Sequence, residues 1–303
     1  MPSVGVLVPV RGPAPFLDEA LESVLGQDPA PVAVVVVDDA SPEPVRIDPA
    51  HARRCTLVRR DVPGGAPGAR DTGLERLRTD LVALLDADDA WRPGKLAAQL
   101  TALGAHPEAA ACFARVRVVD GEGRPTGEQW EALPGGMLEA EALMPVVFER
   151  NPIPTSSVVL QRADLVAAGG FAGPPPCEDQ DLWLRLLRRG HGFACVPEVL
   201  VDYRRHAAAL TADVAALAES SLLVHETHAA AVDAELARRV HANDLTLLAR
   251  GRIRQRRYGE ARAALAEAAS LQPAGARERA LRALLAVPGV RAAFGRRGPY
   301  PVR

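Results

Sequence analysis

Three carboxylates crowd into four residues directly after an apolar run. The run is Leu81-Val82-Ala83-Leu84-Leu85, and Asp86, Asp88 and Asp89 follow it. Such a run is typical of a fully buried strand, so the acids are expected at its carboxyl end, where open α/β sheets bind ligands. Crowded carboxylates raise each other's pKa unless a cation lies among them, and oxygen ligands of this kind suit Mg²⁺ or Mn²⁺, which in turn hold phosphate. The alternative is an Asp-rich turn that caps the helix predicted to begin near Pro93.

A second pair of acids, Asp38 and Asp39, follows the unbroken apolar run 32–37. This run also predicts a buried strand, and parallel strands bring their carboxyl ends to one edge of a sheet. The pattern therefore predicts that Asp39 and Asp88 serve the same edge. The alternative is an Asx-turn that only closes the strand.

A third acidic group, Glu178, Asp179 and Asp181, precedes the apolar stripe of a helix predicted through residues 182–187. A helix N-terminus favours the ionised form of a carboxylate, so one of these acids could take a proton from a reacting hydroxyl. The alternative is that they only cap the helix.

These acids need a sheet to bring them together, and the periodicities predict one. Strand, helix and strand patterns follow one another from residue 4 to residue 37, and further strand-to-helix steps continue to about residue 120. A last strand is expected over residues 193–201. Short connections of this kind are typical of an α/β fold with a mostly parallel sheet flanked by helices. After Thr211, Ala, Leu, Glu and Arg recur at helical spacing. We therefore expect an α/β domain over residues 1–210 and an all-α region over residues 211–303.

Composition and charge indicate a folded protein with an uneven charge distribution. Of 303 residues, 48% are hydrophobic and 24% are charged, which is enough apolar material for a large core. Residues 250–303 hold 13 Arg and 3 Glu, a balance of +10, so the whole-chain net charge of −2 leaves −12 for the rest. No apolar run approaches the ~18 residues of a membrane span, and we expect no signal peptide. The four cysteines are scattered without a Cys-x-x-Cys pair, which fits a reducing cytoplasm.

Taken in order, the motifs resemble the family 2 glycosyltransferases, nucleotide-sugar enzymes with the GT-A fold, over approximately residues 3–211. The matching segments, in chain order, are 6–10, 23–27, 36–41, 86–96, 178–185 and 203–206. Each segment alone would occur by chance, but their order and spacing indicate the family. Arg11 departs from the aromatic or Asn-containing pattern that often follows the Pro of the first strand.

The resemblance implies a Rossmann-like donor half, about residues 1–120, and an acceptor half, about residues 121–210. It implies an inverting transfer from a nucleoside-diphosphate sugar of UDP, dTDP or GDP type to an acceptor hydroxyl, in cell-surface polysaccharide or glycoconjugate synthesis. Such a transfer needs a general base, and a divalent ion, Mg²⁺ or Mn²⁺, stabilises the leaving diphosphate.

Each of these roles has candidate residues. The candidate base is Asp179, with Glu178 and Asp181 as neighbours that could replace it. The candidate metal ligands are Asp88 first, then Asp89, and His206 if its loop folds over the site. The candidate contacts to the nucleotide sugar are Pro9, Arg11, Asp38, Asp39, Arg70, Asp86 and Ala87.

The helical region leaves other possibilities open. Residues 248–273 resemble one helix pair of the tetratricopeptide type, with a turn expected at 258–259 and Ala261, Ala264, Leu265 and Ala268 expected to pack inward. The basic tail favours a peripheral contact with the inner face of a membrane that carries a lipid-linked acceptor, the alternative being that it packs on the acidic body. Nucleic acid is not expected, because few aromatic residues accompany the arginines. His225 and His228 are interpreted as a solvated helix face. A protein of another class, a non-catalytic nucleotide-sugar binder or scaffold, remains the alternative function.

Overall fold

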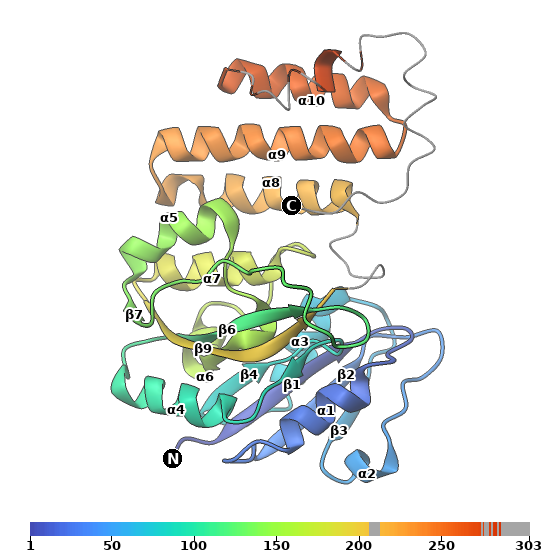
Figure 1. The fold of residues 1–303 in the computed structure, drawn as a ribbon, viewed down its shortest axis with the longest axis vertical. Helices are drawn as coiled ribbons and strands as arrows, with labels where there is room; N and C mark the ends of the chain where they lie inside the picture. Colours follow the sequence, from blue (N-terminus) through green and yellow to red (C-terminus); the bar gives the residue numbers. More distant parts are fainter. Residues whose placement is uncertain (206–212, 274, 276–278, 280, 284, 286–303) are drawn as a thin grey trace. The chain divides into compact units, whose positions relative to one another are not determined.

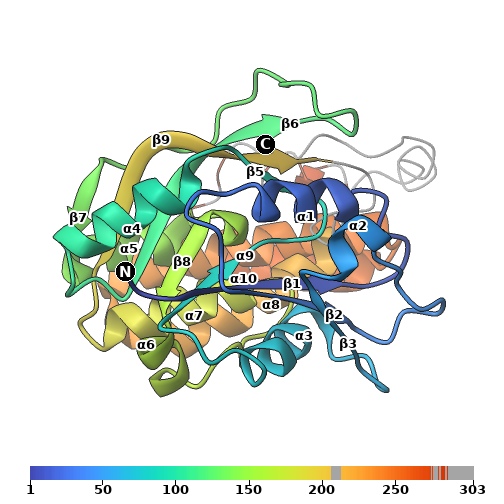
Figure 2. The ribbon, with the colours of Figure 1, turned by 90° about the horizontal axis from the view of Figure 1, so that it is seen from below.

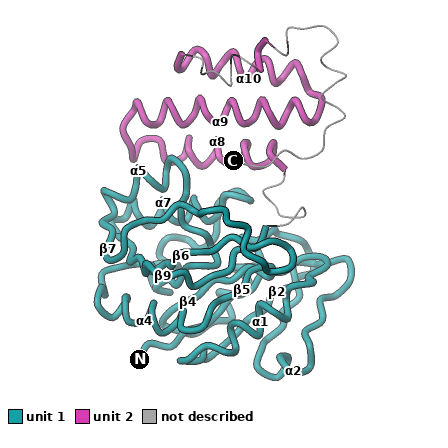
Figure 3. The backbone as a smooth tube through the Cα atoms, in the orientation of Figure 1, with its two compact units in different colours: residues 1–209 teal, residues 210–303 magenta. Residues whose placement is uncertain are grey.

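The computed structural model describes residues 1–205, 213–273, 275, 279, 281–283 and 285. The chain divides into two compact units, residues 1–209 and residues 210–303, which Figure 3 shows in different colours. In the described part of the chain, no helix combines the length and the apolar character needed to cross a membrane.

Unit 1 combines one sheet with helices on both of its faces (Figure 1). Its strands are β1 (Val4–Val10), β2 (Ala33–Asp38), β3 (Thr56–Arg59), β4 (Leu81–Leu84), β5 (Ala90–Trp91), β6 (Ala111–Val119), β7 (Gly136–Leu138), β8 (Val158–Gln161) and β9 (Phe193–Arg204). Its helices are α1 (Leu17–Leu25), α2 (Pro49–Ala52), α3 (Gly65–Leu74), α4 (Lys95–Ala105), α5 (Ala140–Arg150), α6 (Arg162–Ala167) and α7 (Glu178–Arg188), with the 3₁₀ turn η1 (Thr155–Ser157) before β8.

The sheet has the strand order β3-β2-β1-β4-β8-β6-β9-β5, and β7 also pairs with β9. The strands β1, β2, β3 and β4 are all parallel, whereas β8 lies antiparallel between β4 and β6. β2 and β4 flank β1, so their carboxyl ends lie at the same edge. The expected fold class, a mostly parallel α/β sheet flanked by helices, is confirmed.

Side-chain alternation along β1 explains how the sheet is covered. Val6 and Val8 belong to the core that includes α1 and α4, and Leu7 faces α3 on the opposite side (Figure 2). At Gly73 of α3, a Cβ atom would come within 2.4 Å of a Leu7 methyl group. Glycine therefore lets α3 lie directly on the sheet, because any larger residue would displace the Leu7 side chain.

Two boundaries differ from the sequence-based expectation. The last strand, expected to end near residue 201, continues to Arg204, because β9 pairs with β6 as far as Val119. The helix expected at Pro93 begins at Lys95, and Gly94 occupies its N-cap position without a side-chain cap. The alternative that one of the acids at 86–89 caps this helix is therefore wrong.

Lys95, the chain's single lysine, is fully buried. Its Nζ donates to Gln99 Oε1 at 2.6 Å and lies 4.0 Å from the centre of the Trp91 ring. The Trp91 indole in turn donates to the carbonyl of Ser156 at 2.9 Å. The contacts to Lys95 are uncharged, and burial lowers its pKa to about 7.

We expect Lys95 to make the free energy of unfolding depend on alkaline pH. The pKa of an unfolded lysine is about 10.4, so between about pH 7 and pH 10 the unfolded chain binds the extra proton and stability rises with pH. Lys95→Met should lose this rise of a few kcal/mol, as measured by urea unfolding at several pH values. A single lysine resonance in a lysine-labelled sample reports the titration directly. Parallel stability curves for the two proteins would contradict the expectation.

Unit 2 is helical, with α8 (Val214–His228), η3 (Ala229–Ala231), α9 (Ala234–Arg254) and α10 (Tyr258–Leu271) among its described residues. A Cβ atom at Gly251 would lie 2.6 Å from the Cα atom of Ala215, so glycine lets α8 and α9 pack closely. The residues expected to pack inward, Ala261, Ala264, Leu265 and Ala268, are buried. The predicted turn at 258–259 is displaced, since Tyr258 already begins α10.

The interpretation of His225 and His228 as a solvated helix face is wrong. Both side chains are buried, and His225 Nδ1 lies 2.6 Å from Oδ2 of Asp244 on α9. Sequence periodicity on one helix could not reveal a carboxylate supplied by the next.

Candidate active site

Two acidic segments begin at the same edge of the sheet, one after β2 and the other after β4, on either side of β1. The last residue of β2, Asp38, pairs in register with Val10, and the last residue of β4, Leu84, pairs with Leu7. The segments that follow these strands carry Asp39 and the acids at 86–89. The candidate site is built from these segments and from the start of α7.

Asp38 is buried and closes the turn after β2. Its carboxylate accepts the backbone N–H of Ser41 at 2.9 Å and that of Val45 at 3.2 Å, and it pairs with Arg59. Burial alone would raise the pKa of Asp38, but the hydrogen bonds outweigh it and leave the pKa below its ordinary value. The contacts of Asp38 therefore agree with the alternative that this acid closes the turn after the strand.

Asp39 binds the glycine-rich loop that precedes α3. Its carboxylate accepts the backbone N–H groups of Gly64 at 2.8 Å and Gly65 at 2.7 Å, and Arg60 Nε lies 3.0 Å away. Gly65 has φ of 69°, a left-handed conformation that favours glycine. A buried acid at the end of one strand therefore fixes the loop that follows the next.

The remaining candidates near this edge differ in exposure. Pro9 is half-buried within β1, and Arg11, just beyond the strand, is exposed. Ala87 packs against the apolar core.

The three acids after β4 lie in different environments. Asp86 is one-third exposed, and its backbone N–H donates to Ser156 Oγ at 3.0 Å. Asp88 is half-buried, whereas Asp89 is buried. Burial and the charges of Asp88 and Asp86 raise the pKa of Asp89 well above its ordinary value. A positive charge placed among these side chains would relieve this repulsion.

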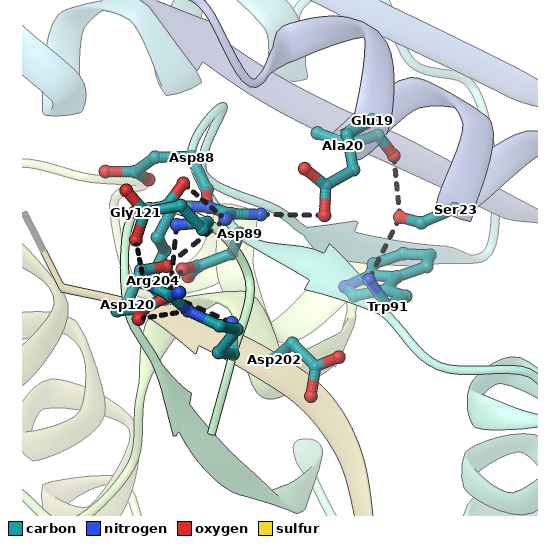
Figure 4. A network of polar contacts seen from close by, with 12 residues as sticks. Glu19, Ala20, Ser23, Asp88, Asp89, Trp91, Asp120, Gly121, Asp202 and Arg204 are labelled. Atoms are coloured by element: carbon teal, nitrogen blue, oxygen red, sulfur yellow. Dashed lines mark hydrogen bonds and ion pairs between the residues drawn. The ribbon is translucent and has the colours of Figure 1, made fainter. Parts of the chain in front are cut away.

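Arg204 at the end of β9 holds this acidic segment in place (Figure 4). Its backbone N–H donates to Asp89 Oδ1 at 2.8 Å, and its Nε donates to the carbonyl of Asp88 at 2.8 Å. Its guanidinium also pairs with Glu19 of α1 at 2.7 Å and donates to the carbonyl of Asp120 at 3.3 Å. Figure 4 shows the Asp88 carboxylate directed away from Arg204.

Arg70 of α3 joins the acidic motif to α7. Its Nη2 donates to Asp86 Oδ1 and its Nη1 donates to Glu178 Oε1, each at 2.6 Å. The side chain is only 3% exposed. One buried guanidinium thus brings together acids that are 92 positions apart in the chain.

Asp179, in the first turn of α7, accepts hydrogen bonds from two other segments. Thr155 Oγ1 donates to its Oδ2 at 2.8 Å, and Asn151 Nδ2 donates to its Oδ1 at 3.3 Å. Burial and the neighbouring charge of Glu178 raise its pKa to about 6. A carboxylate with this pKa is ionised at neutral pH and remains basic enough to accept a proton.

The two acids beside Asp179 have separate partners. Glu178 pairs with Arg70, whereas Asp181 Oδ2 accepts Nε of Arg185 at 2.7 Å. Arg185 also donates to the carbonyl of Gly170 at 2.8 Å. Helix α7 has Cys177 at its N-cap position without a side-chain cap, and Asp179 Oδ1 accepts the backbone N–H of Gln180 in the first turn at 2.6 Å, so the capping alternative holds in part for Asp179.

The acidic segment has features that fit a divalent ion. Oδ2 of Asp89 is buried and makes no hydrogen bond to the described residues. Within the residues that the structure describes, no three His, Cys, Asp or Glu side chains are arranged to hold an ion by themselves. Mg²⁺ commonly takes one or two carboxylates and completes its shell with water and substrate phosphates, and Asp88 and Asp89 meet that requirement. The third candidate ligand, His206, lies outside the described residues.

Some residues around the site were not assigned roles from the sequence. Asn151 and Thr155 contact Asp179, and Arg204 contacts Asp88 and Asp89. Asn151 gave a local signal, because an Asn-Pro pair favours a turn, and Arg204 lies in the matching segment 203–206. Asn151 ends α5 with φ of 37°, a conformation uncommon outside glycine.

Comparison with known proteins identifies the relatives of this chain. The model of the family described as "Glycosyl transferase family 2" matches residues 5–166. The amylovoran biosynthesis glycosyltransferase AmsE of Erwinia amylovora is 31% identical over 140 residues, which cover 46% of this chain and 50% of the relative. The chain spans about half the length of the curated relatives it matches.

Solved structures share the fold at low sequence identity. S. aureus TarS (residues 1–349) in complex with UDP-GlcNAc is 16% identical, with a TM-score of 0.64 and coverage of 96% of this chain and 88% of that one. The mannosyltransferase PcManGT from Pyrobaculum calidifontis, in complex with GDP-Man and Mn²⁺, is 22% identical, with a TM-score of 0.58 and coverage of 97% and 83%.

Proposed function

The chain belongs to glycosyl transferase family 2, and from that premise we propose that it transfers a sugar from a nucleoside diphosphate to an acceptor hydroxyl with inversion at the anomeric carbon. The observation that carries the proposal is the Arg70 bridge. Asp86 of the donor-side motif and Glu178, next to the candidate base, both lie 2.6 Å from its guanidinium. A displacement reaction needs the groups that stabilise the leaving diphosphate to lie close to the general base. The Arg70 bridge supports such an arrangement, because it links the donor-side motif to the start of α7.

The donor side of the site would hold the nucleotide and a divalent ion. Asp88, with Asp89 and His206, would bind Mg²⁺ or Mn²⁺, which supplies Lewis-acid stabilisation of the leaving diphosphate. The nucleoside would contact Asp39 and the residues around it. The other candidate contacts are Pro9, Arg11, Asp38, Asp86 and Ala87. The structural neighbours with UDP-GlcNAc and GDP-Man support a donor of UDP or GDP type, and the dTDP type stays open.

Asp179 would act as the general base. It accepts the proton of the acceptor hydroxyl while that oxygen forms a bond to the anomeric carbon. The bond from this carbon to the diphosphate oxygen breaks, and the diphosphate leaves with the bonding electron pair. The pKa of about 6 supports this role, because Asp179 is then ionised before the reaction. Glu178 and Asp181 are less suited, since each carboxylate is paired with an arginine.

A donor screen tests the proposal. UDP-, dTDP- and GDP-sugars with Mn²⁺ should include one that raises the melting temperature, because a ligand that binds only the folded state stabilises it. The same donor should be consumed in the presence of acceptor hydroxyls, and NMR of the product should show the inverted anomer. Binding without turnover across a broad acceptor panel would favour a non-catalytic binder, and a retained anomeric configuration would reject the inverting mechanism.

The acceptor is proposed to belong to a polysaccharide or glycoconjugate pathway at the cytoplasmic face of a membrane. The name of AmsE, an amylovoran biosynthesis enzyme, supports the pathway class. The basic stretch from Arg250 supports contact with an anionic lipid surface. Sedimentation with anionic liposomes tests this contact by comparing the native chain with a variant in which Arg291, Arg296 and Arg297 become Ser. Equal recovery of both proteins in the supernatant would reject it.

A further inference from the structure

The Arg70 side chain is buried and packed in place, unlike an exposed arginine that binds phosphate at a protein surface. Its side chain is 3% exposed, and the guanidinium carbon lies 5.6 Å from the centre of the Phe171 ring. Helix α3, which carries it, lies directly on β1 through Gly73. The position of the guanidinium is thus set by the fold.

Both terminal nitrogens of Arg70 already bind carboxylates. Nη2 binds Asp86 and Nη1 binds Glu178, and Arg70 Nε makes no hydrogen bond to the described residues. Burial alone would lower the pKa of Arg70, but the charges of Asp86 and Glu178 raise it. Arg70 is therefore charged at every relevant pH, and one positive charge faces two negative ones.

The positively charged Arg70 pairs with Glu178, which is the residue next to the candidate base Asp179. The charged groups that act on Asp179 are Glu178 in its own helix and Arg70 from α3. The groups that reach Asp179 from the end of α5 and from η1 are the uncharged Asn151 and Thr155. Among these groups, Arg70 supplies the positive charge that favours the ionised carboxylate of Asp179, and it reaches the start of α7 through its ion pair with Glu178.

We propose that Arg70 is a positioning residue that ties the donor-side acid Asp86 to helix α7 and keeps Asp179 ionised for its reaction. This inference rests on the proposed role of Asp179 as the base. It replaces the expectation of a direct nucleotide contact for Arg70 with an action through its two carboxylate partners. Without the guanidinium, Asp86 and Glu178 would be left as buried or half-buried negative charges, and both would favour the protonated form of Asp179.

The test is the titration of Asp179 in the full chain. Aspartate carboxyl carbons are labelled, and the Asp179 resonance is assigned by its loss in Asp179→Asn. In Arg70→Gln, the pKa of Asp179 should rise by about one unit, because an opposite charge has been removed. In Glu178→Gln it should fall, because a like charge has been removed. Arg70→Lys keeps the charge but not the two-pronged geometry, so the pKa should stay close to that of the native chain.

The same shifts should appear in catalysis. The acidic limb of the pH profile of kcat/KM should move to higher pH in Arg70→Gln and to lower pH in Glu178→Gln. An unchanged Asp179 titration in Arg70→Gln, or shifts of the same sign in both variants, would overturn the proposal. If Arg70→Gln fails to fold by circular dichroism, two other results decide: a lower pKa of Asp179 in Glu178→Gln and a native-like pKa of Asp179 in Arg70→Lys. The titration needs no substrate, so opposite shifts without transfer from any donor would reject the proposed function and leave the electrostatic link intact.

Discussion

Asp179→Asn should lower kcat by about 10³-fold with little change in the KM of the donor, which is the range expected for the loss of a general base. The substitution keeps the size of the side chain and its hydrogen bond from Thr155, but the amide cannot take a proton from the acceptor hydroxyl. Initial rates at saturating donor measure the effect. A residual rate near that of the native chain would assign the base to another group.

The pH profile adds a second expectation for Asp179. The reactive form is the ionised carboxylate, so kcat/KM should rise with pH and level off above the pKa of about 6. Asp181→Asn is the matched variant, because its carboxylate lies in the same helix and pairs with Arg185. It should keep the acidic limb and most of kcat. A stronger effect of Asp181→Asn than of Asp179→Asn would reverse the assignment.

Asp88→Asn should reduce Mn²⁺-dependent turnover by about 10³-fold, or ~4 kcal/mol of transition-state stabilisation. The Asp88 carboxylate is directed away from Arg204, which binds the backbone carbonyl of Asp88, so the substitution removes the proposed metal ligand and leaves that contact in place. Mn²⁺ binding by electron paramagnetic resonance should weaken together with the turnover.

The control for Asp88 is Asp80→Asn. Asp80 precedes the same strand, β4, but lies at the opposite end, where it accepts hydrogen bonds from Ser3 at 2.8 Å. This variant should bind Mn²⁺ and turn over donor like the native chain. Equal Mn²⁺ binding by the Asp88→Asn variant and the native chain would remove Asp88 from the metal site.

Local patterns predicted the parts of the site that depend on strand ends. Asp38 and Asp39 follow one apolar run and Asp86 follows another, and in a parallel sheet this alone brings them to one edge. Helix α7 was likewise visible from its apolar stripe. The burial of Trp183 at 0% exposure agrees with that stripe.

Contacts between distant segments could not be predicted in this way. Arg204 binds Glu19 across 185 positions, and Arg70 binds Glu178 across 108. Nothing in the immediate surroundings of an arginine shows which carboxylate it will meet, because that depends on the packing of whole elements. The same reason explains Lys95, whose polar side chain gave no indication of complete burial.

The loop tethered by Asp39 also bears on how donor preference could be changed by design. The Asp39 carboxylate accepts two backbone N–H groups and so stabilises the loop conformation independently of any nucleobase. Replacing Asp39 alone would release the loop together with any base contact, so loss of binding in that variant would not identify a specificity residue. Exchanging residues 63–68 while retaining Asp39 would vary the side chains of the loop and keep the carboxylate that holds it. Donor range in this chain is therefore better altered through the loop than through the acid that fastens it.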